Sequence, residues 1–160
     1  MQIIQPSVEL LQITSNPEQL IELSGRTCYK SEDKITDGSA AKFVRMIQNK
    51  GHASVIEHAS ATFRIITDRG ISHEIVRHRI ASYSQESSRY CRYSNECQFI
   101  SPPKLTFEQY KLWMDLCVAA EKAYISMLNS GCSPQIARSV LPSCLKTELV
   151  MTANFRSWLN

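Results

Sequence analysis

The order of apolar segments predicts a small β-sheet covered by helices, in the α+β or α/β class. Segments in which apolar and polar residues mix or alternate, at 3–13, 58–67 and 145–153, are typical of strands. Segments with helical spacing of apolar residues lie between them, and the longest spans about 106–129. Because no repeat, low-complexity tract or linker interrupts this order, residues 1–160 are predicted to form a single domain.

Capping residues set the limits of the predicted helices in the first part of the chain. The dipeptide Asn-Pro at 16–17 predicts a helix that runs to about residue 28. A second helix, capped by Thr36 or Asp37, is expected to end near Gly51. The apolar residues of this second helix share one face, as expected for a helix that packs against a core.

The later elements follow the same logic. Residues 68–70, Asp-Arg-Gly, predict a turn, and a short helix over 71–79 should follow it. Thr106 is the expected cap of the longest helix. The remaining elements are a short helix over 135–140 and a last helix capped by Asn154.

The positive charge of the chain is concentrated in one window. The net charge is +3, and residues 61–92 hold six arginines against three acidic residues, so this window carries the whole excess. Its segment 77–90 adds four serines, two tyrosines and one histidine. Arginine binds phosphate and carboxylate with a planar fork, serine donates hydrogen bonds, and tyrosine offers a flat face. This combination predicts a site for an anionic, aromatic small molecule such as a nucleotide.

Two other interpretations of the segment 77–90 remain open at this level. A lone charge cluster is usually a solvated surface, although solubility does not require the interleaved serines and tyrosines. Arginine and aromatic side chains also suit single-stranded RNA. A net charge of +3 does not by itself indicate nucleic-acid binding, and we expect no nucleic-acid partner.

Standard motifs for metals and nucleotides are absent from the sequence. There is no P-loop or GxGxxG motif, and none of the six cysteines forms a CxxC pair. His73 and His78 are five residues apart rather than the four of HExxH, so no metal is expected. No apolar run approaches the roughly 20 residues of a membrane span, and no signal peptide is evident. We therefore expect a reduced, cytoplasmic protein that binds no membrane.

Four segments, in a fixed order, resemble a known family. They read GHxSxxEH at 51–58, RHR with seven residues and then Ser at 77–87, ARxxLP at 137–142, and Asn-x-Arg-Ser at 154–157. Together they span nearly the whole chain and resemble the flavin-dependent thymidylate synthases. The motif at 77–87 is highly specific for that family.

The resemblance implies a fold, an assembly and a reaction. The fold would be α+β, with a mixed, mainly antiparallel sheet covered by helices. Members form homotetramers whose active sites lie where subunits meet, so that more than one chain contacts each FAD and dUMP. The reaction would be the reductive methylation of dUMP to dTMP with methylenetetrahydrofolate and NADPH through FAD. The protein would orient the reactants and supply electrostatics, without a nucleophile of its own.

The resemblance also implies which residues form the site. The expected FAD-binding residues are Ser54, Arg77, His78, Arg79, Gln85, Asn154, Phe155, Arg156 and Asn160. The expected dUMP-binding residues are Glu74, Ile75, Val76, Arg77, Gln85, Glu86, Ser87, Ser88, Arg89 and Arg138. In this assignment Ser87 orients the substrate and does not attack it.

The chain departs from the family pattern in two places. Many members have Asn-Glu where this chain has Ser84 and Gln85, so the resemblance carries no acid or base role to Gln85. Members also continue beyond the position of Asn160, and an arginine thought to favour ionisation of dUMP N3 lies there. The chain is therefore predicted to lack the C-terminal part of the domain, and its catalytic residue is not assigned. A catalytically incomplete module that binds FAD and dUMP is the alternative to an active enzyme.

Overall fold

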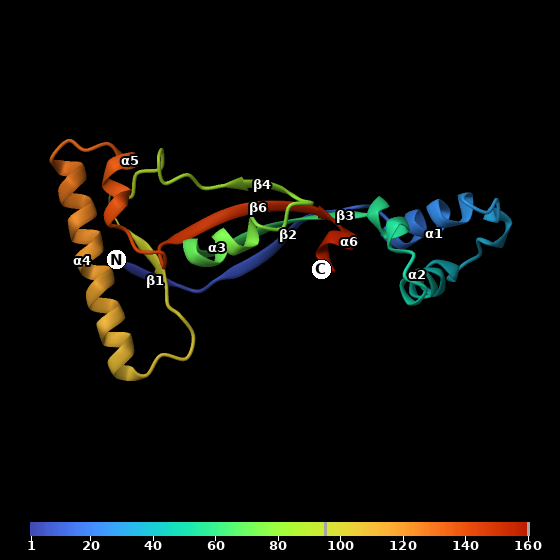
Figure 1. The fold of residues 1–160 in the computed structure, drawn as a ribbon, viewed down its shortest axis with the longest axis horizontal. Coiled ribbons are helices and arrows are strands. Elements are labelled where there is room, and N and C mark those ends of the chain that lie inside the picture. The colour runs from blue at the N-terminus through green and yellow to red at the C-terminus, as the bar shows by residue number, and fades with distance from the viewer. Residues whose placement is uncertain (95, 160) are drawn as a thin grey trace. The chain divides into compact units, whose positions relative to one another are not determined.

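The fold combines helices with two β-sheets, as Figure 1 shows. A computed structural model describes residues 1–94 and 96–159. The chain divides into two compact units, each built from several segments. The first unit comprises residues 1–8, 65–77 and 84–149, and the second comprises residues 9–64, 78–83 and 150–160.

The helices and strands alternate along the chain. In order they are β1 (Gln2–Ile4), β2 (Ser7–Ile13), α1 (Pro17–Thr27), the 3₁₀ helix η1 (Glu32–Lys34), α2 (Ser39–Asn49), the 3₁₀ helix η2 (Ala53–His58), β3 (Ser60–Asp68), α3 (Arg69–Ile75), β4 (Ser82–Gln85), β5 (Gln98–Ile100), α4 (Phe107–Asn129), α5 (Pro134–Ala137), the 3₁₀ helix η3 (Arg138–Val140), β6 (Lys146–Asn154) and α6 (Phe155–Trp158).

Four strands form the larger sheet, in the order β2-β3-β6-β4. The hydroxyls of Thr62 and Thr152 are 2.9 Å apart, and the N–H of Arg69 donates to the carbonyl of Leu145. Residue numbers rise along β3 as they fall along β6, so these strands run antiparallel. The smaller sheet pairs β1 with β5 in parallel. The prediction of a mixed, mainly antiparallel sheet in an α+β fold is therefore confirmed.

The core of the first unit gathers around α4. Its buried residues are Cys97, Phe99, Cys117, Tyr124, Leu128, Ala137 and Leu145. The side chain of Thr106 accepts from the N–H of Gln109, whose side chain accepts from the N–H of Thr106, so the predicted cap is a full capping box. This long helix packs against α5 and η3, which carry part of the site described below.

The core of the second unit lies between α1, α2 and η2. Its buried residues are Ile21, Phe43, Ile47, Ile56 and Ala59. The two helices approach closely at Gly25, where an added Cβ would lie 2.6 Å from the Phe43 ring. Glycine at this position is therefore a packing requirement.

In the first part of the chain, one predicted strand and one predicted helix cap were wrong. The strand expected over 3–13 is divided into β1 and β2 around Pro6, which has no N–H for a sheet hydrogen bond. Helix α1 begins at Pro17 directly after its N-cap residue Asn16, as predicted, but Asn16 has a left-handed backbone with φ 49° and its side chain makes no capping hydrogen bond. The cap of α2 is Gly38, with φ 76°, and not Thr36 or Asp37.

The turn predicted at 68–70 was also wrong. The Asp68 carboxylate accepts from the N–H of Ile71 at 2.8 Å and caps α3, which begins at Arg69. This helix ends at Ile75, four residues before the predicted end at 79. The strands β4 and β5 were not predicted.

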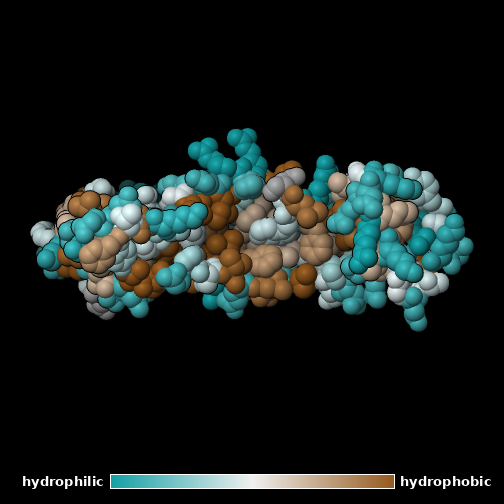
Figure 2. All heavy atoms as spheres, turned by 90° about the horizontal axis from the view of Figure 1, so that it is seen from below, coloured by the Kyte–Doolittle hydropathy of each residue, from teal (hydrophilic) through white to brown (hydrophobic). Residues whose placement is uncertain are grey.

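Strand β2, at one edge of the larger sheet, exposes large apolar side chains on both of its faces. Val8 is 67% exposed and Leu10 is 50% exposed, and Leu11 and Ile13 are exposed as well. Figure 2 shows hydrophobic residues on the surface of the face that it displays. An apolar edge strand of this kind is typical of a surface that another chain covers.

Within the described residues, no helix has the length and the hydrophobicity needed to cross a membrane.

Candidate functional site

A basic cavity of about 660 Å³ lies in the first unit. Its charged and polar lining includes Arg69, His73, Ser88, Gln135 and Arg138. None of the lining residues that the structure describes is acidic. A cavity of this size and charge suits an anionic ligand such as a mononucleotide. The name "basic cavity" is used below for this site.

In the turn after β4, neighbouring residues differ in their exposure to solvent. The carbonyl of Ser87 accepts from the N–H groups of Tyr90 at 3.0 Å and Cys91 at 2.9 Å, which closes the turn. Ser88 is only 3% exposed, whereas Arg89 is exposed. The turn therefore brings one small hydroxyl to the wall of the basic cavity.

Arg138 and Arg89 are both tied to this wall. Arg138 Nη1 donates to Ser88 Oγ at 3.2 Å. Arg89 donates from Nε and Nη2 to Gln135 Oε1 at 3.4 and 3.2 Å. Three of the expected dUMP-binding residues thus lie together. Gln135 was not predicted, because nothing in its sequence context distinguishes it from a surface residue of a short helix.

Gln85 connects three elements of the first unit. Its Nε2 donates to Ser72 Oγ at 2.9 Å and to Thr147 Oγ1 at 3.1 Å. Both hydroxyl residues are fully buried. The hydroxyl of Ser72 in turn donates to the carbonyl of Arg69 at 3.0 Å. A neutral amide satisfies these acceptors, whereas a carboxylate would have no hydrogen to donate to them.

Glu86 belongs to a half-buried charge network beside the end of β4. It accepts hydrogen bonds from the Tyr93 hydroxyl and from Lys146 Nζ, the latter at 2.9 Å. Burial and, secondarily, the hydrogen bond to Glu86 raise the pKa of Tyr93 above its ordinary value. Burial alone would lower the pKa of Lys146, but Glu86 and Glu148 outweigh it, so that the pKa is raised. Glu86 is not among the residues that line the basic cavity.

The other expected dUMP residues lie at the end of α3. Glu74 and Arg77 are exposed, and Ile75 and Val76 are half-buried. The N–H of Arg77 donates to the carbonyl of Glu74 at 3.0 Å and forms the turn that ends the helix. None of these four residues lines the basic cavity.

The Arg-His-Arg segment lies in irregular backbone directly after this turn. Arg77, His78 and Arg79 are exposed, and their side chains form no hydrogen bond or ion pair within residues 1–94 and 96–159. The Tyr83 hydroxyl donates to the carbonyl of His78 at 2.6 Å and holds the backbone of this loop. Three such unpaired donors in a row remain available to an anion.

In the second unit, the segments that contain Ser54 and Asn154 are adjacent. The N–H of Phe155 donates to the carbonyl of Ala59 at 2.8 Å. An ion pair between Arg156 and Glu57 joins α6 to η2. Two motifs that are about a hundred residues apart in the sequence therefore meet in space.

Asn154 confirms its predicted capping role. Its Oδ1 accepts from the N–H of Ser157 at 2.9 Å at the start of α6. Ser54 is exposed on η2. The predicted FAD contact at Asn160 lies outside the described residues.

An apolar cavity of about 370 Å³ adjoins α6 in the second unit. Its lining includes Ile21, Ile56, Phe155 and Trp158. The Trp158 Nε1 donates to the carbonyl of Ala61 at 3.3 Å, which fixes the indole. Flat aromatic groups fit cavities with this kind of lining.

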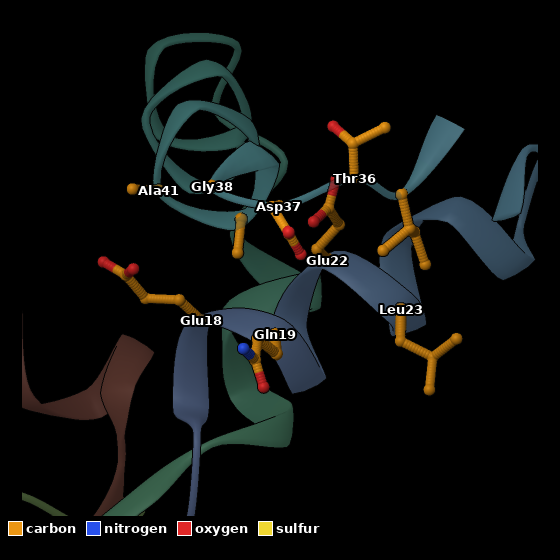
Figure 3. Close-up of a pocket in the computed structure, with 10 residues that line it drawn as sticks. Glu18, Gln19, Glu22, Leu23, Thr36, Asp37, Gly38 and Ala41 are labelled. Carbon is orange, nitrogen blue, oxygen red and sulfur yellow. The ribbon is translucent and has the colours of Figure 1, made fainter. Parts of the chain in front are cut away.

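A third cavity, of about 530 Å³, lies in the second unit and is acidic. Figure 3 shows Glu18, Glu22 and Asp37 around it. Glu22 is 1% exposed and accepts from Arg26 Nε and from Ser39 Oγ, each at 2.7 Å. Its carboxylates would repel a phosphate, and the described residues contain no group of three or more potential metal ligands.

The sequence matches one family model over residues 9–160. That model is described as "Thymidylate synthase complementing protein". The chain belongs to this family. The resemblance noted from its four motifs is thereby confirmed.

Curated members of the family support the match along most of the chain. The flavin-dependent thymidylate synthase of Geobacter sulfurreducens is 34% identical over 163 residues, which cover 96% of this chain and 70% of the relative. The protein of the same name from Mycolicibacterium gilvum is 36% identical over 173 residues, which cover 96% of this chain and 69% of the relative.

A solved structure shares the family fold. The UMP/dUMP methylase PolB from Streptomyces cacaoi, bound with 5-Br dUMP, superposes with a TM-score of 0.86. The alignment covers 98% of this chain and 76% of that chain at 24% identity. This similarity establishes the fold.

Proposed function

We propose that this protein is a flavin-dependent thymidylate synthase. It carries out the reductive methylation of dUMP to dTMP, with FAD as cofactor and NADPH and methylenetetrahydrofolate as co-substrates. The basic cavity is the observation that carries the proposal, because Ser88 and Arg138, which the family resemblance assigns to dUMP, line it together. Relatives that are 34% and 36% identical bear the name of this activity.

The basic cavity suits the phosphate of dUMP. Arg138 presents a guanidinium fork that can bind two phosphate oxygens. Ser88 accepts a hydrogen bond from Arg138 with its oxygen, so its own hydroxyl hydrogen is free to point toward the ligand. Arg89, held by Gln135, adds a third donor at the rim. Ser87 orients the pyrimidine as a neutral donor in this proposal.

The chain also has residues that fit FAD. The unpaired side chains of Arg77, His78 and Arg79 suit its diphosphate. The apolar cavity beside Phe155 suits a flat ring, with Ser54 nearby on η2. Bound FAD would supply the redox chemistry of the reduction. The protein would then contribute position, orientation and charge.

The family activity can be tested directly. Purified protein is given FAD, dUMP, methylenetetrahydrofolate and NADPH, and dTMP and tritium release from [5-³H]dUMP are measured. We expect FAD binding and dTMP formation, both intact in Lys111→Ala, an exposed cation on α4. Arg138→Ala should lose dTMP formation at low dUMP. A folded protein that binds neither FAD nor dUMP would contradict the proposal, and binding of both without dTMP would indicate a ligand-binding module.

We also propose a cytoplasmic homotetramer that binds dUMP and folate, with no nucleic-acid or membrane partner. The exposed apolar residues of β2 support self-association, because an uncovered apolar edge strand favours pairing with another chain. Light scattering coupled to size exclusion should give four times the chain mass of 18.2 kDa. A monomer would overturn this part of the proposal.

A further inference from the structure

Arg69 is half-buried, and one nitrogen of its guanidinium has no hydrogen-bond partner among the described residues. That nitrogen, Nη1, is itself buried, and within the described residues only Trp113 Nε1 shares this state. No ion pair involves Arg69 in the described part of the chain. Buried polar groups are normally paired, and buried charges are normally balanced. The missing partner of this guanidinium is therefore expected to come from outside the chain.

The backbone holds Arg69 firmly at the wall of the basic cavity. Its N–H donates to the carbonyl of Leu145 at 3.0 Å, and its carbonyl accepts from Ser72 Oγ at 3.0 Å. The N–H of the next residue, Gly70, donates to the carbonyl of Ser143 at 3.1 Å, so the start of α3 lies against the segment that precedes β6. The two hydrogen bonds of Arg69 itself fix the backbone from which its side chain reaches the lining of the cavity.

The charges of the basic cavity match one class of anion. Arg69 and Arg138 supply two permanent positive charges, and His73 is a third basic group. The lining residues include no carboxylate to offset them. A phosphate monoester carries a charge of about −1.5 to −2 at neutral pH, with three acceptor oxygens. Two guanidinium forks and the Ser88 hydroxyl are a complementary set of donors for it.

We propose that Arg69 is a phosphate ligand of the basic cavity and that, with Arg138, it selects the dianionic form of a nucleoside 5′-monophosphate. This proposal rests on the proposed function and extends it to a residue that none of the four motifs contains. It makes the phosphate, and not the nucleoside, the main determinant of affinity. Affinity should therefore fall as the phosphate is protonated near pH 6.

A different source of phosphate is the diphosphate of FAD. The two sources share their chemistry but differ in the groups that accompany it. A nucleoside monophosphate would depend on both Arg69 and Arg138, whereas FAD binding would depend on the unpaired arginines at 77 and 79. Titrations with each ligand separate the two.

The test uses the full chain and three ligands. The dissociation constants of dUMP, deoxyuridine and FAD are measured by calorimetry for wild type, Arg69→Gln, Arg69→Lys and the control Lys111→Gln. We expect dUMP to bind about 10- to 100-fold more weakly to Arg69→Gln, from the usual strength of a charge-assisted hydrogen bond. Arg69→Lys should lose less, because it keeps the charge but not the fork. Deoxyuridine and FAD affinities should not change.

Unchanged dUMP affinity in a folded Arg69→Gln protein would overturn the proposal, as would an equal loss of deoxyuridine affinity. If Arg69→Gln does not fold, ³¹P NMR of wild type decides, because two bound cations should lower the pKa of the bound phosphate below that of free dUMP. An unshifted phosphate pKa would count against the proposal. If wild type does not bind dUMP, the proposed function fails, and titration with inorganic phosphate of wild type and Arg69→Lys still tests Arg69 as an anion ligand.

Discussion

The basic cavity of the first unit and the acidic cavity of the second are similar in volume, about 660 and 530 Å³, but opposite in charge. In the acidic cavity, the most buried charge, Glu22, is satisfied by Arg26 and Ser39 within the chain. In the basic cavity, one buried nitrogen of Arg69 has no hydrogen-bond partner within residues 1–94 and 96–159. A charge that the chain satisfies contributes to the fold, whereas a charge that it leaves unsatisfied is available to a ligand. The two cavities therefore differ less in volume than in whether the chain supplies hydrogen-bond partners for their charged side chains.

The largest effect is expected from removing Glu22, the buried carboxylate whose hydrogen-bond partners lie within the chain. Glu22→Ala should lower the free energy of unfolding by about 3 kcal/mol, because it leaves Arg26 largely buried without its partner. The affinity for dUMP of the protein that remains folded should not change. Thermal and urea unfolding measure the first effect, and calorimetry the second. Glu18→Ala is the matched control, since Glu18 lines the same cavity but is exposed. Equal stability of the two variants would contradict the comparison.

Charge reversal in each cavity tests which one binds the nucleotide. Arg138→Glu should weaken dUMP binding by at least about 100-fold, because it removes a fork and adds repulsion. Glu18→Lys should change dUMP affinity less than about twofold, although it alters the net charge by the opposite amount. Calorimetry at fixed ionic strength measures both. A large gain in dUMP affinity for Glu18→Lys would show that the net charge of the whole chain, and not the basic cavity, attracts the ligand.

A smaller effect is expected at Gln85. Gln85→Glu should lower the free energy of unfolding by about 1–2 kcal/mol at pH 8, since a carboxylate cannot donate to Ser72 and Thr147. Burial would raise the pKa of this new carboxyl in the folded state, so the loss should appear as pH rises above about 4.3 and vanish below it. Urea unfolding of both proteins at pH 5 and pH 8 provides the test. If the loss of unfolding free energy is the same at both pH values, its cause is altered packing of the side chain and not the charge of the new carboxylate.

The smallest effect concerns thiol reactivity. Burial raises the pKa of Cys97 to about 11 and that of Cys117 to about 12. At pH 8 they are almost entirely protonated, so iodoacetamide should modify the exposed Cys28 and Cys91 first. If dUMP binds in the first unit, it should slow modification of Cys117 further by reducing local opening. Mass spectrometry of alkylated peptides measures each rate, and early labelling of Cys117 would argue against this prediction.

Local features of the sequence were sufficient to predict much of the fold. Thr106 and Asn154 lie at the helix starts where their capping chemistry predicts them. These predictions succeed because a cap depends on neighbours within a few residues. The four motifs were likewise sufficient for the family, which the family model and the relatives confirm. The roles of the individual site residues stay predictions.

The sequence by itself therefore determined the class of fold, the main helices and the family of this protein. Only the tertiary structure decided where β4 lies, since the N–H of Glu86 that follows it pairs with the carbonyl of the remote Glu148. Arg69 was predicted to lie in a turn, but the structure places it at the start of α3, where it lines a cavity together with Arg138. One nitrogen of its guanidinium is buried there without a hydrogen-bond partner among the described residues. Burial and charge balance depend on residues far apart in the chain, and no local pattern reports them.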